Sequence, residues 1–160
     1  RTIAQLDLTW NHVHPDGAAA ILDALRFNET LHTLSIGWNC LGRRGGVMLG
    51  KLLAENTTLR RVDVASCQMD AGCTEELAAG LRANTTLKVI KMDWNSFGDG
   101  VPTLVAALAT HHPNGPMHSL ENCRFDALRH MERSVVEEGN PTGRYRFDLG
   151  LEAHRAALKP

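Results

Sequence analysis

The chain has 160 residues, of which 43% are hydrophobic, and its formal net charge at pH 7 is −1. This length predicts a single domain, and the near-neutral charge gives no general attraction to nucleic acid or to an anionic membrane. No apolar run is long enough to cross a membrane, and the first residues do not form a signal peptide.

Residues 3 to 126 repeat with a fixed period of 28 residues, without insertion or deletion. The repeated segments begin at Ile3, Leu31, Leu59 and Leu87, and a degenerate fifth one runs from Gly115 to Cys123. In each full unit two apolar residues alternate with polar ones, which predicts one buried face of a short strand. These pairs are Leu6 and Leu8, Leu34 and Ile36, Val62 and Val64, and Ile90 and Met92. Equivalent strands should pair one repeat apart in a parallel sheet.

A polar column follows each strand, and a helix follows each column. Asparagine or cysteine recurs where the chain leaves the sheet, and should satisfy backbone groups there: Asn11, Asn39, Cys67, Asn95 and Cys123. Gly17 or Gly45 is expected where the chain enters the helix. Two apolar columns predict the buried helix face, namely Ile21, Leu49, Leu77 and Val105, and Leu25, Leu53 and Leu81. Asn28, Asn56 and Asn84 should close the helices in the left-handed conformation that asparagine tolerates.

The pattern L-x-x-L-x-L-x-x-N/C-x-L with a helical 28-residue unit resembles the ribonuclease-inhibitor-like class of leucine-rich repeats. The resemblance implies an α/β solenoid, a horseshoe segment with a parallel sheet on the concave face and helices on the convex face. Residues 1–126 would hold four full units and the degenerate fifth. A narrower resemblance, carried by Leu6 to Ala18 (LDLTWNHVHPDGA) and the NETL and NTTL turns, is to intracellular repeat proteins of ciliated cells and axonemes.

Residues 127–160 are expected to cap the solenoid. An amphipathic helix is predicted from Phe125 to Gly139, followed by a turn at Asn140 to Gly143. Tyr145, Phe147 and Leu149 then alternate with charged residues, which indicates a strand able to cover the free edge of the sheet. The chain opens inside a repeat strand without an initiator methionine, so we expect it to be the C-terminal part of a longer protein.

The cysteines and the glycosylation sequons bear on the compartment. The four cysteines (Cys40, Cys67, Cys73 and Cys123) show no metal-binding or redox spacing, so reduced, buried thiols and an intracellular location are expected. Three N-x-T sequons fall at one repeat position, Asn28, Asn56 and Asn84. Repeat chemistry at the helix ends explains all three together better than glycan attachment does.

Two kinds of residue are candidates for partner contact. Strand residues that point away from the core should line the concave face, and among them Asp7, Ser35, Arg61, Asp63, Lys91 and Asp93 carry polar or charged groups. Small residues at its centre, such as Gly37 and Ala65, should let a partner approach the backbone. All three tryptophans (Trp10, Trp38 and Trp94) occupy one repeat slot at the strand exit, where repeat three has Ser66. The rings could form a binding rim or could stack on neighbouring repeats for stability, and the sequence leaves both open.

No motif indicates catalysis, a cofactor or a metal. His111, His112 and His118 lack a ligand spacing, the segment from Gly42 to Gly46 lacks the Lys-Ser/Thr ending of a phosphate loop, and Ser66 lacks nucleophile-elbow glycines. The sequence therefore predicts a non-catalytic scaffold that binds other proteins, with neither nucleic acid nor membrane as partner. The ciliary resemblance implies a structural or docking subunit of a cytoskeletal, axonemal assembly in the cytoplasm or cilium. The main alternative is a regulatory, ligand-sensing repeat domain of a larger signalling or innate-immune-type protein.

Overall fold

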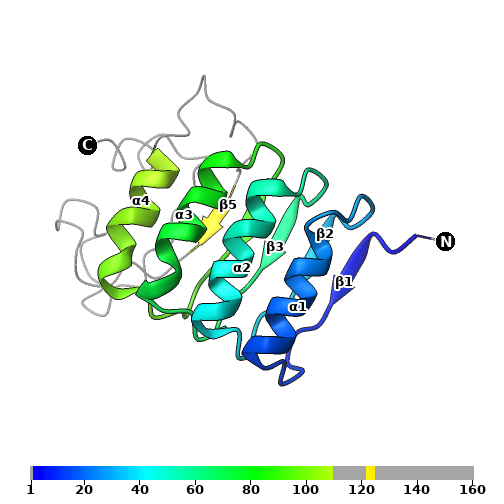
Figure 1. The fold of residues 1–160 in the computed structure, drawn as a ribbon, viewed down its shortest axis with the longest axis horizontal. Helices are drawn as coiled ribbons and strands as arrows, with labels where there is room; N and C mark the ends of the chain where they lie inside the picture. Colours follow the sequence, from blue (N-terminus) through cyan, green and yellow to red (C-terminus); the bar gives the residue numbers. More distant parts are fainter. Residues whose placement is uncertain (1, 110–121, 125–160) are drawn as a thin grey trace, which may run out of the picture.

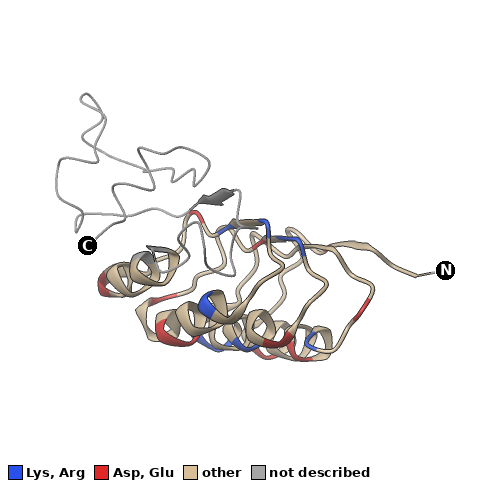
Figure 2. Ribbon diagram, turned by 90° about the horizontal axis from the view of Figure 1, so that it is seen from above, with Lys and Arg blue, Asp and Glu red and all other residues tan. Residues whose placement is uncertain are grey.

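The computed structural model describes residues 2–109 and 122–124, and within them it forms a parallel sheet covered on one side by helices (Figure 1). The strands are β1 (Gln5–Asp7), β2 (Thr33–Ser35), β3 (Arg61–Asp63), β4 (Val89–Lys91) and β5 (Asn122–Arg124). They pair in chain order, and the helices lie beside one another along the other layer (Figures 1 and 2). The predicted α/β solenoid is confirmed.

The helices follow the strands one by one. They are α1 (Pro15–Leu25), α2 (Gly42–Glu55), α3 (Thr74–Ala83) and α4 (Val101–Ala109), and the 3-10 turns η1 (Ala71–Cys73) and η2 (Gly98–Gly100) lead into α3 and α4. Gly17 and Gly45, expected at the helix entrances, instead lie inside the first turns of α1 and α2. Pro15 begins α1 at a position where its missing N–H costs nothing.

The first four strands pair in the register that the 28-residue period predicts. Leu34 is paired with Leu6 on one side and Val62 on the other, and Ile90 follows Val62. The alternating apolar residues of β2, β3 and β4 are buried as expected, whereas Leu6 and Leu8 at the β1 edge are half-buried. The strands themselves are only three residues long, and backbone bonds such as that from the Ile36 amide to the Asp63 carbonyl (2.9 Å) continue the pairing beyond them.

The predicted fifth repeat is wrong in its register. β5 places Cys123 opposite Ile90, five residues later in the chain than the period predicts, which would have put His118 there. An imidazole is a poor substitute for the apolar residues of that column, because burying a polar group without a partner is costly. Cys123 therefore does not occupy the Asn/Cys column. The predicted capping helix, turn and edge strand of residues 127–160, together with Phe125, lie outside the described residues.

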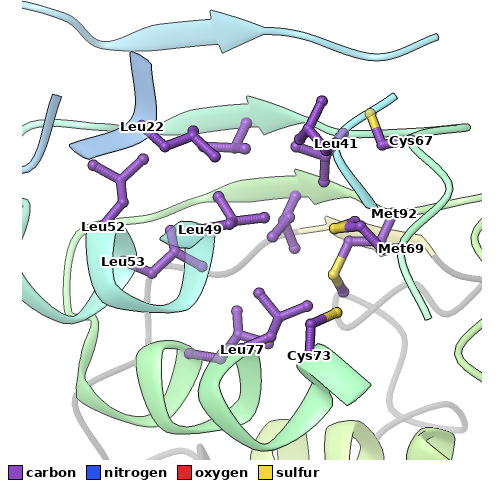
Figure 3. Packing of buried hydrophobic residues seen from close by; sticks show 14 of the residues in the cluster. Leu22, Leu41, Leu49, Leu52, Leu53, Cys67, Met69, Cys73, Leu77 and Met92 are labelled. Carbon is purple, nitrogen blue, oxygen red and sulfur yellow. The ribbon is translucent and has the colours of Figure 1, made fainter. Parts of the chain in front are cut away.

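The core lies between the sheet and the helices and runs through consecutive repeats (Figure 3). Leu49, Leu53, Leu77 and Leu81 of the predicted helix columns are buried. Ile21 and Leu25 of α1 are only half-buried, at the β1 end of the stack. Cys67 and Cys73 contribute their thiols to this core, and Met69 and Met92 lie beside them (Figure 3). Each repeat thus buries its apolar face against its neighbours rather than within itself.

Two ladders of asparagine side chains join the repeats, one at each end of the helices. At the strand exit, Asn39 Oδ1 accepts from the amides of Asn11 (3.0 Å) and Val13 (2.9 Å), while its Nδ2 donates to the Leu8 and Ile36 carbonyls (both 2.8 Å). Asn95, two repeats later, makes the same set of bonds with Cys67, Met69, Val64 and Met92. The predicted role of this column is therefore confirmed for both asparagines.

At the ends of α2 and α3 the predicted asparagines are right and the predicted reason is wrong, whereas α1 ends at Leu25 with Arg26 as its C-cap, so Asn28 does not close that helix. Asn56 and Asn84 follow α2 and α3 with extended backbone (φ −78° and −74°), not the left-handed conformation. Asn84 Oδ1 accepts from the amides of Thr86 (2.9 Å) and Leu87 (2.7 Å), and its Nδ2 donates to the Leu53 carbonyl (2.8 Å). Since Asn56 and Asn84 are each 3% exposed, their amide nitrogens are used inside the fold, which favours repeat chemistry over glycan attachment.

Candidate partner-binding surface

Three exposed indole rings define the first part of the candidate surface, which we call the tryptophan rim: Trp10, Trp38 and Trp94. Each tryptophan lies two residues after the second apolar residue of its repeat strand: Leu8, Ile36 or Met92. The exposed fractions of Trp10, Trp38 and Trp94 are 66%, 42% and 45%. Aromatic side chains at protein interfaces bury a large area for few rotatable bonds. The structure therefore presents three such groups at equivalent positions of three repeats.

The rim residues have an unusual backbone. Trp10, Trp38 and Trp94 have φ of 62°, 58° and 65°, and Ser66 in the same slot of repeat three has φ of 53°. This left-handed region costs an L-residue roughly 1–2 kcal/mol. Hydrogen bonds to the next repeat hold the turn, because the Trp38 amide donates to the Ala65 carbonyl (2.8 Å) and the Ser66 amide donates to the Asp93 carbonyl (2.8 Å). The solenoid thus imposes the conformation, whichever residue occupies the slot.

Two of the three rings stack on each other. The centroids of Trp10 and Trp38 lie 4.3 Å apart and their planes differ by 12°. Part of the stability interpretation is therefore correct for this pair. Stacking across adjacent repeats leaves both rings substantially exposed, so the pair forms a flat aromatic surface rather than a buried contact.

The strand residues beside the rim form a row across the sheet. Asp7, Ser35, Asp63 and Lys91 are register partners on successive strands, and Lys91 Nζ lies 3.3 Å from Asp63 Oδ2. Arg61 is exposed at the other end of β3. Charges of both signs lie along the strand side of the molecule (Figure 2). A partner would therefore be recognised there by specific pairs rather than by a field of one sign.

Several of these residues also hold the backbone. Asp7 Oδ1 accepts from the Thr9 amide (2.9 Å), and Asp63 Oδ1 accepts from the Ala65 amide (3.1 Å). Hydrogen bonds from the Thr9 side chain and amide lower the pKa of the Asp7 carboxyl. Each carboxylate thus fixes the strand exit that carries the next rim residue, in addition to any contact with a partner.

Two expectations about this face are wrong. Asp93 is only 8% exposed, so it offers little surface. Gly37 is also buried, and a Cβ there would lie 3.0 Å from the Ala65 carbonyl oxygen and 3.1 Å from Asp63 Oδ1. Gly37 is thus closely packed between repeats and leaves no exposed backbone for a partner to approach.

The sequence did not single out the exposed Phe27, which lies after α1. Its side chain is 76% exposed, and the Arg26 guanidinium lies 5.2 Å from its ring centroid. Arg26 also bonds both oxygens of Glu55 on the next repeat (2.8 and 2.7 Å), and this interaction lowers the pKa of Glu55. A phenylalanine flanked by a cation on the surface carries no repeat signature, so only the structure reveals it.

The other sequence candidates have ordinary structural roles. Arg43 and Arg44 pair with Asp70 and Asp16 of neighbouring repeats (3.2 and 2.6 Å), so they are not an isolated basic patch. Burial raises the pKa of the Cys67 thiol beside Ser66 to about 12, which makes it a poor nucleophile. Among residues 2–109 and 122–124, no group of three or more His, Cys, Asp or Glu could hold a metal ion. His111, His112 and His118 lie outside the described residues.

Within the described part of the chain, no helix is both long and apolar enough to span a bilayer.

Comparison with known proteins identifies the repeats. The leucine-rich repeat family model matches residues 1–22, 27–50 and 55–72. The chain is 32% identical over 94 residues to human Protein NLRC5, and 34% identical over 109 residues to mouse NACHT, LRR and PYD domains-containing protein 9B. These alignments cover 59% and 66% of the chain, which spans only 5% and 11% of the two relatives.

A solved structure shares the architecture. Actin-binding site 2 of leiomodin-1 superposes with a TM-score of 0.66, covering 79% of this chain and 72% of that one at 11% sequence identity. At this identity the likeness concerns the fold alone. A repeat solenoid of this kind presents an extended surface for binding other proteins. The family match, the related sequences and the parallel sheet with its row of helices together show that the chain is a leucine-rich repeat protein.

Proposed function

We propose that this chain is a non-catalytic protein-binding scaffold, whose partner contacts the tryptophan rim and the adjacent strand residues. The observation that carries the proposal is the exposure of Trp10, Trp38 and Trp94, between 42% and 66%, at one position of three repeats. The partner contacts would come from Asp7, Ser35, Arg61, Asp63 and Lys91 beside the rings.

Ser66 indicates whether the turn needs an aromatic ring for its structure. It occupies the rim slot of repeat three with φ of 53° and makes the same backbone hydrogen bond as Trp38. The turn therefore forms without an aromatic ring. Since tryptophan gains nothing from a left-handed backbone, its presence at the other three positions favours a role for the ring at the surface.

Two settings for such a scaffold differ in the partner they predict. The resemblance of the repeat-one segment to proteins of ciliated cells favours a structural or docking subunit of an axonemal, cytoskeletal assembly. The identity to NLRC5 and to the NACHT, LRR and PYD protein favours a regulatory repeat domain within a larger protein. The second setting has the stronger support, since the aligned segments, which cover 59% and 66% of this chain, are 32% and 34% identical to the two relatives.

The test is affinity capture from a ciliated-cell extract with three folded baits. They are the intact chain, the triple variant Trp10→Asn, Trp38→Asn and Trp94→Asn, and the control Phe27→Ser. Asparagine tolerates the left-handed backbone of the rim, so the triple variant should fold. Phe27→Ser removes an exposed aromatic ring outside the rim. Circular dichroism would verify that all three baits are folded before capture.

Proteins retained by the intact chain and by Phe27→Ser, but lost with the triple variant, would support the proposal. Axonemal proteins among them would favour the ciliary setting, and signalling proteins or GTPases would favour the regulatory one. Equal retention by all three baits would refute the rim as the binding surface.

A further inference from the structure

One end face of the solenoid consists of core positions that lie open within the described part of the chain. Four residues of repeat one are exposed although their counterparts in the next three repeats are all buried: Ile3, Asn11, Gly17 and Ala24. Ile3 is 66% exposed, whereas Leu31, Leu59 and Leu87 in the same column are at most 3% exposed. We call these four residues, together with the open edge of β1 and the Asn28 side chain, the repeat-one face.

The helix side of this face is apolar and free of unpaired charge. Gly17, Ile21 and Ala24 follow one another along α1 at helical spacing, and Ile21 is half-buried. The acidic residues of α1 pair with arginines, Asp16 with Arg44 of α2 (2.6 Å) and Asp23 with Arg26 (2.7 Å). Gly80, in the Ala24 column, shows what normally covers such a position, because a Cβ there would lie 2.1 Å from the Gly50 carbonyl oxygen of the preceding helix.

The sheet side of the face is an open strand edge. Among the described strands β1 pairs only with β2, and the Thr33 amide donates to the Ala4 carbonyl (3.1 Å). Alternate residues of a strand direct their backbone groups to opposite sides, so the groups of Gln5 and Asp7 point away from β2. Their equivalents in β2, Thr33 and Ser35, face the preceding strand. A strand parallel to β1 would therefore meet the same row of donors and acceptors that β1 meets at β2.

The Asn28 side chain uses only half of the bonding set of its column. Its Oδ1 accepts from the amides of Thr30 (3.0 Å) and Leu31 (2.7 Å), as Asn56 and Asn84 do in their own loops. The Nδ2 of Asn56 donates to the Leu25 carbonyl (2.9 Å) and that of Asn84 to its equivalent one repeat later. Within residues 2–109 and 122–124, the Nδ2 of Asn28 makes no such bond. The missing acceptor is the carbonyl that ends a preceding helix.

Helix polarity decides between two kinds of occupant. A second copy related by a two-fold axis would run antiparallel to α1 and place the start of its own helix beside Asn28. A helix start presents N–H groups, which cannot accept from Nδ2. A helix parallel to α1 instead ends beside Asn28 and presents its last carbonyls there. The occupant must therefore offer a strand and a helix that both run parallel to those of repeat one.

We propose that a further leucine-rich repeat of the same polypeptide stacks on the repeat-one face, in parallel register with β1 and α1. Only such a unit supplies the strand edge, the apolar helix side and the carbonyl for Asn28 together. The relatives favour the same polypeptide as its source, since this chain spans 5% and 11% of their lengths. This interface is separate from the tryptophan rim and does not rest on the proposed function.

The first test uses the protein as cells make it, isolated with an antibody raised against the 160-residue chain. Sequencing by mass spectrometry should find residues ahead of Arg1 with the pattern L-x-x-L-x-L-x-x-N/C-x-L in the 28-residue period. Hydrogen exchange would then be compared with that of the 160-residue chain. The peptide that contains Gln5 and Asp7 should exchange at least about tenfold more slowly in the isolated protein, because its outward amides become hydrogen-bonded.

The second test compares the 160-residue chain with a version extended by a copy of residues 31–56 ahead of Arg1. This extension keeps the period, because Arg1 and Thr2 then take the turn positions that follow Asn56. Asn28→Asp retains the oxygen acceptor and removes the Nδ2 donor. It should leave the urea midpoint of the 160-residue chain nearly unchanged and lower that of the extended chain. Asn56→Asp is the matched control and should lower both midpoints, since its Nδ2 is bonded in both.

Four outcomes would overturn the proposal. They are an isolated protein without a repeat ahead of Arg1, equally fast exchange of the Gln5 peptide in both proteins, the same effect of Asn28→Asp on both lengths, and a dimer of the 160-residue chain, seen by sedimentation, that protects this peptide. The last result would assign the face to a second copy. None of the four bears on the tryptophan rim, whose own test is partner capture.

Discussion

The close contact between helices α2 and α3 gives the sharpest prediction about stability. A Cβ at Gly50 would lie 2.3 Å from the Glu76 carbonyl oxygen, and one at Gly80 would lie 2.1 Å from the Gly50 carbonyl oxygen. The two helices thus meet backbone to backbone at a pair of glycines. Gly50→Ala would force them apart by about 0.7 Å to reach even the 3.0 Å limit that real Cβ atoms respect.

The sign of the effect distinguishes packing from helix propensity. Alanine is favoured over glycine inside a helix by about 0.8–1.0 kcal/mol, so propensity alone predicts stabilisation. Overpacking typically costs about 1–3 kcal/mol, and the group in the way here is a backbone carbonyl that cannot rotate aside. We therefore expect Gly50→Ala to lower the free energy of unfolding by about 1–2 kcal/mol.

Gly17 provides the matched control. It lies in the first turn of α1, and a Cβ there would meet only Val13 Cγ1, at an ordinary 3.8 Å. Gly17→Ala should therefore be neutral or stabilising, by up to about 1 kcal/mol. Urea unfolding followed by circular dichroism would measure both variants. If Gly50→Ala proves as stable as Gly17→Ala, the close helix contact does not exist as described.

Three further predictions concern the ladders, the rim and the thiols. Asn84→Ala removes the acceptor of the part-buried Thr86 amide and of the buried Leu87 amide, so urea unfolding should show the free energy of unfolding lowered by about 2–4 kcal/mol, and a decrease under about 1 kcal/mol would contradict the ladder. Trp38→Asn relieves left-handed strain but loses one stacking contact, so the free energy of unfolding in urea should change by less than about 1 kcal/mol. A larger decrease would show that the Trp38 ring stabilises the fold. Burial raises the pKa of the Cys67 and Cys73 thiols to about 12 and about 11, so thiol labelling at pH 8 should modify Cys40 well before either. Because an unfolded thiol titrates near 9.0, the stability that Cys67 contributes is complete below pH 9 and is lost as the pH rises towards 12, and comparison with Cys67→Ala across that range would reveal it.

The period of the sequence was sufficient to predict the register of four strands. A shift of 28 residues places Leu34, Val62 and Ile90 at the same position on successive strands. A slip of one residue in this register would turn the apolar side chains of a strand to the other face of the sheet. The register of the fifth strand was predicted wrongly because extrapolating the period assumes that the repeat continues. Once Gly115 and His118 replace its apolar residues, the register of β5 is set by Cys123 opposite Ile90.

The helix-end asparagines show a different limit. Local preference correctly suggests asparagine at such a position, and the left-handed backbone is its usual explanation. Here Asn56 and Asn84 are extended because each side chain bonds both its own loop and the preceding repeat, as in the contact from Asn84 Nδ2 to the Asn56 carbonyl (3.2 Å). That partner lies 28 residues away in the chain, so no local pattern contains it.

The left-handed conformation was found at the tryptophans instead, where no residue preference predicts it. Glycine or asparagine would adopt φ near 60° at little cost, whereas an indole side chain has no intrinsic preference for this conformation. The Trp38 amide bond to Ala65 and the Ser66 amide bond to Asp93 over-determine the turn, so the fold withstands the strain whichever side chain is present. Strain of this kind concentrates at functional positions. A turn that accepts serine in one repeat and tryptophan in three others does not require an aromatic ring, and we propose that the exposed rings serve partner contact rather than the turn.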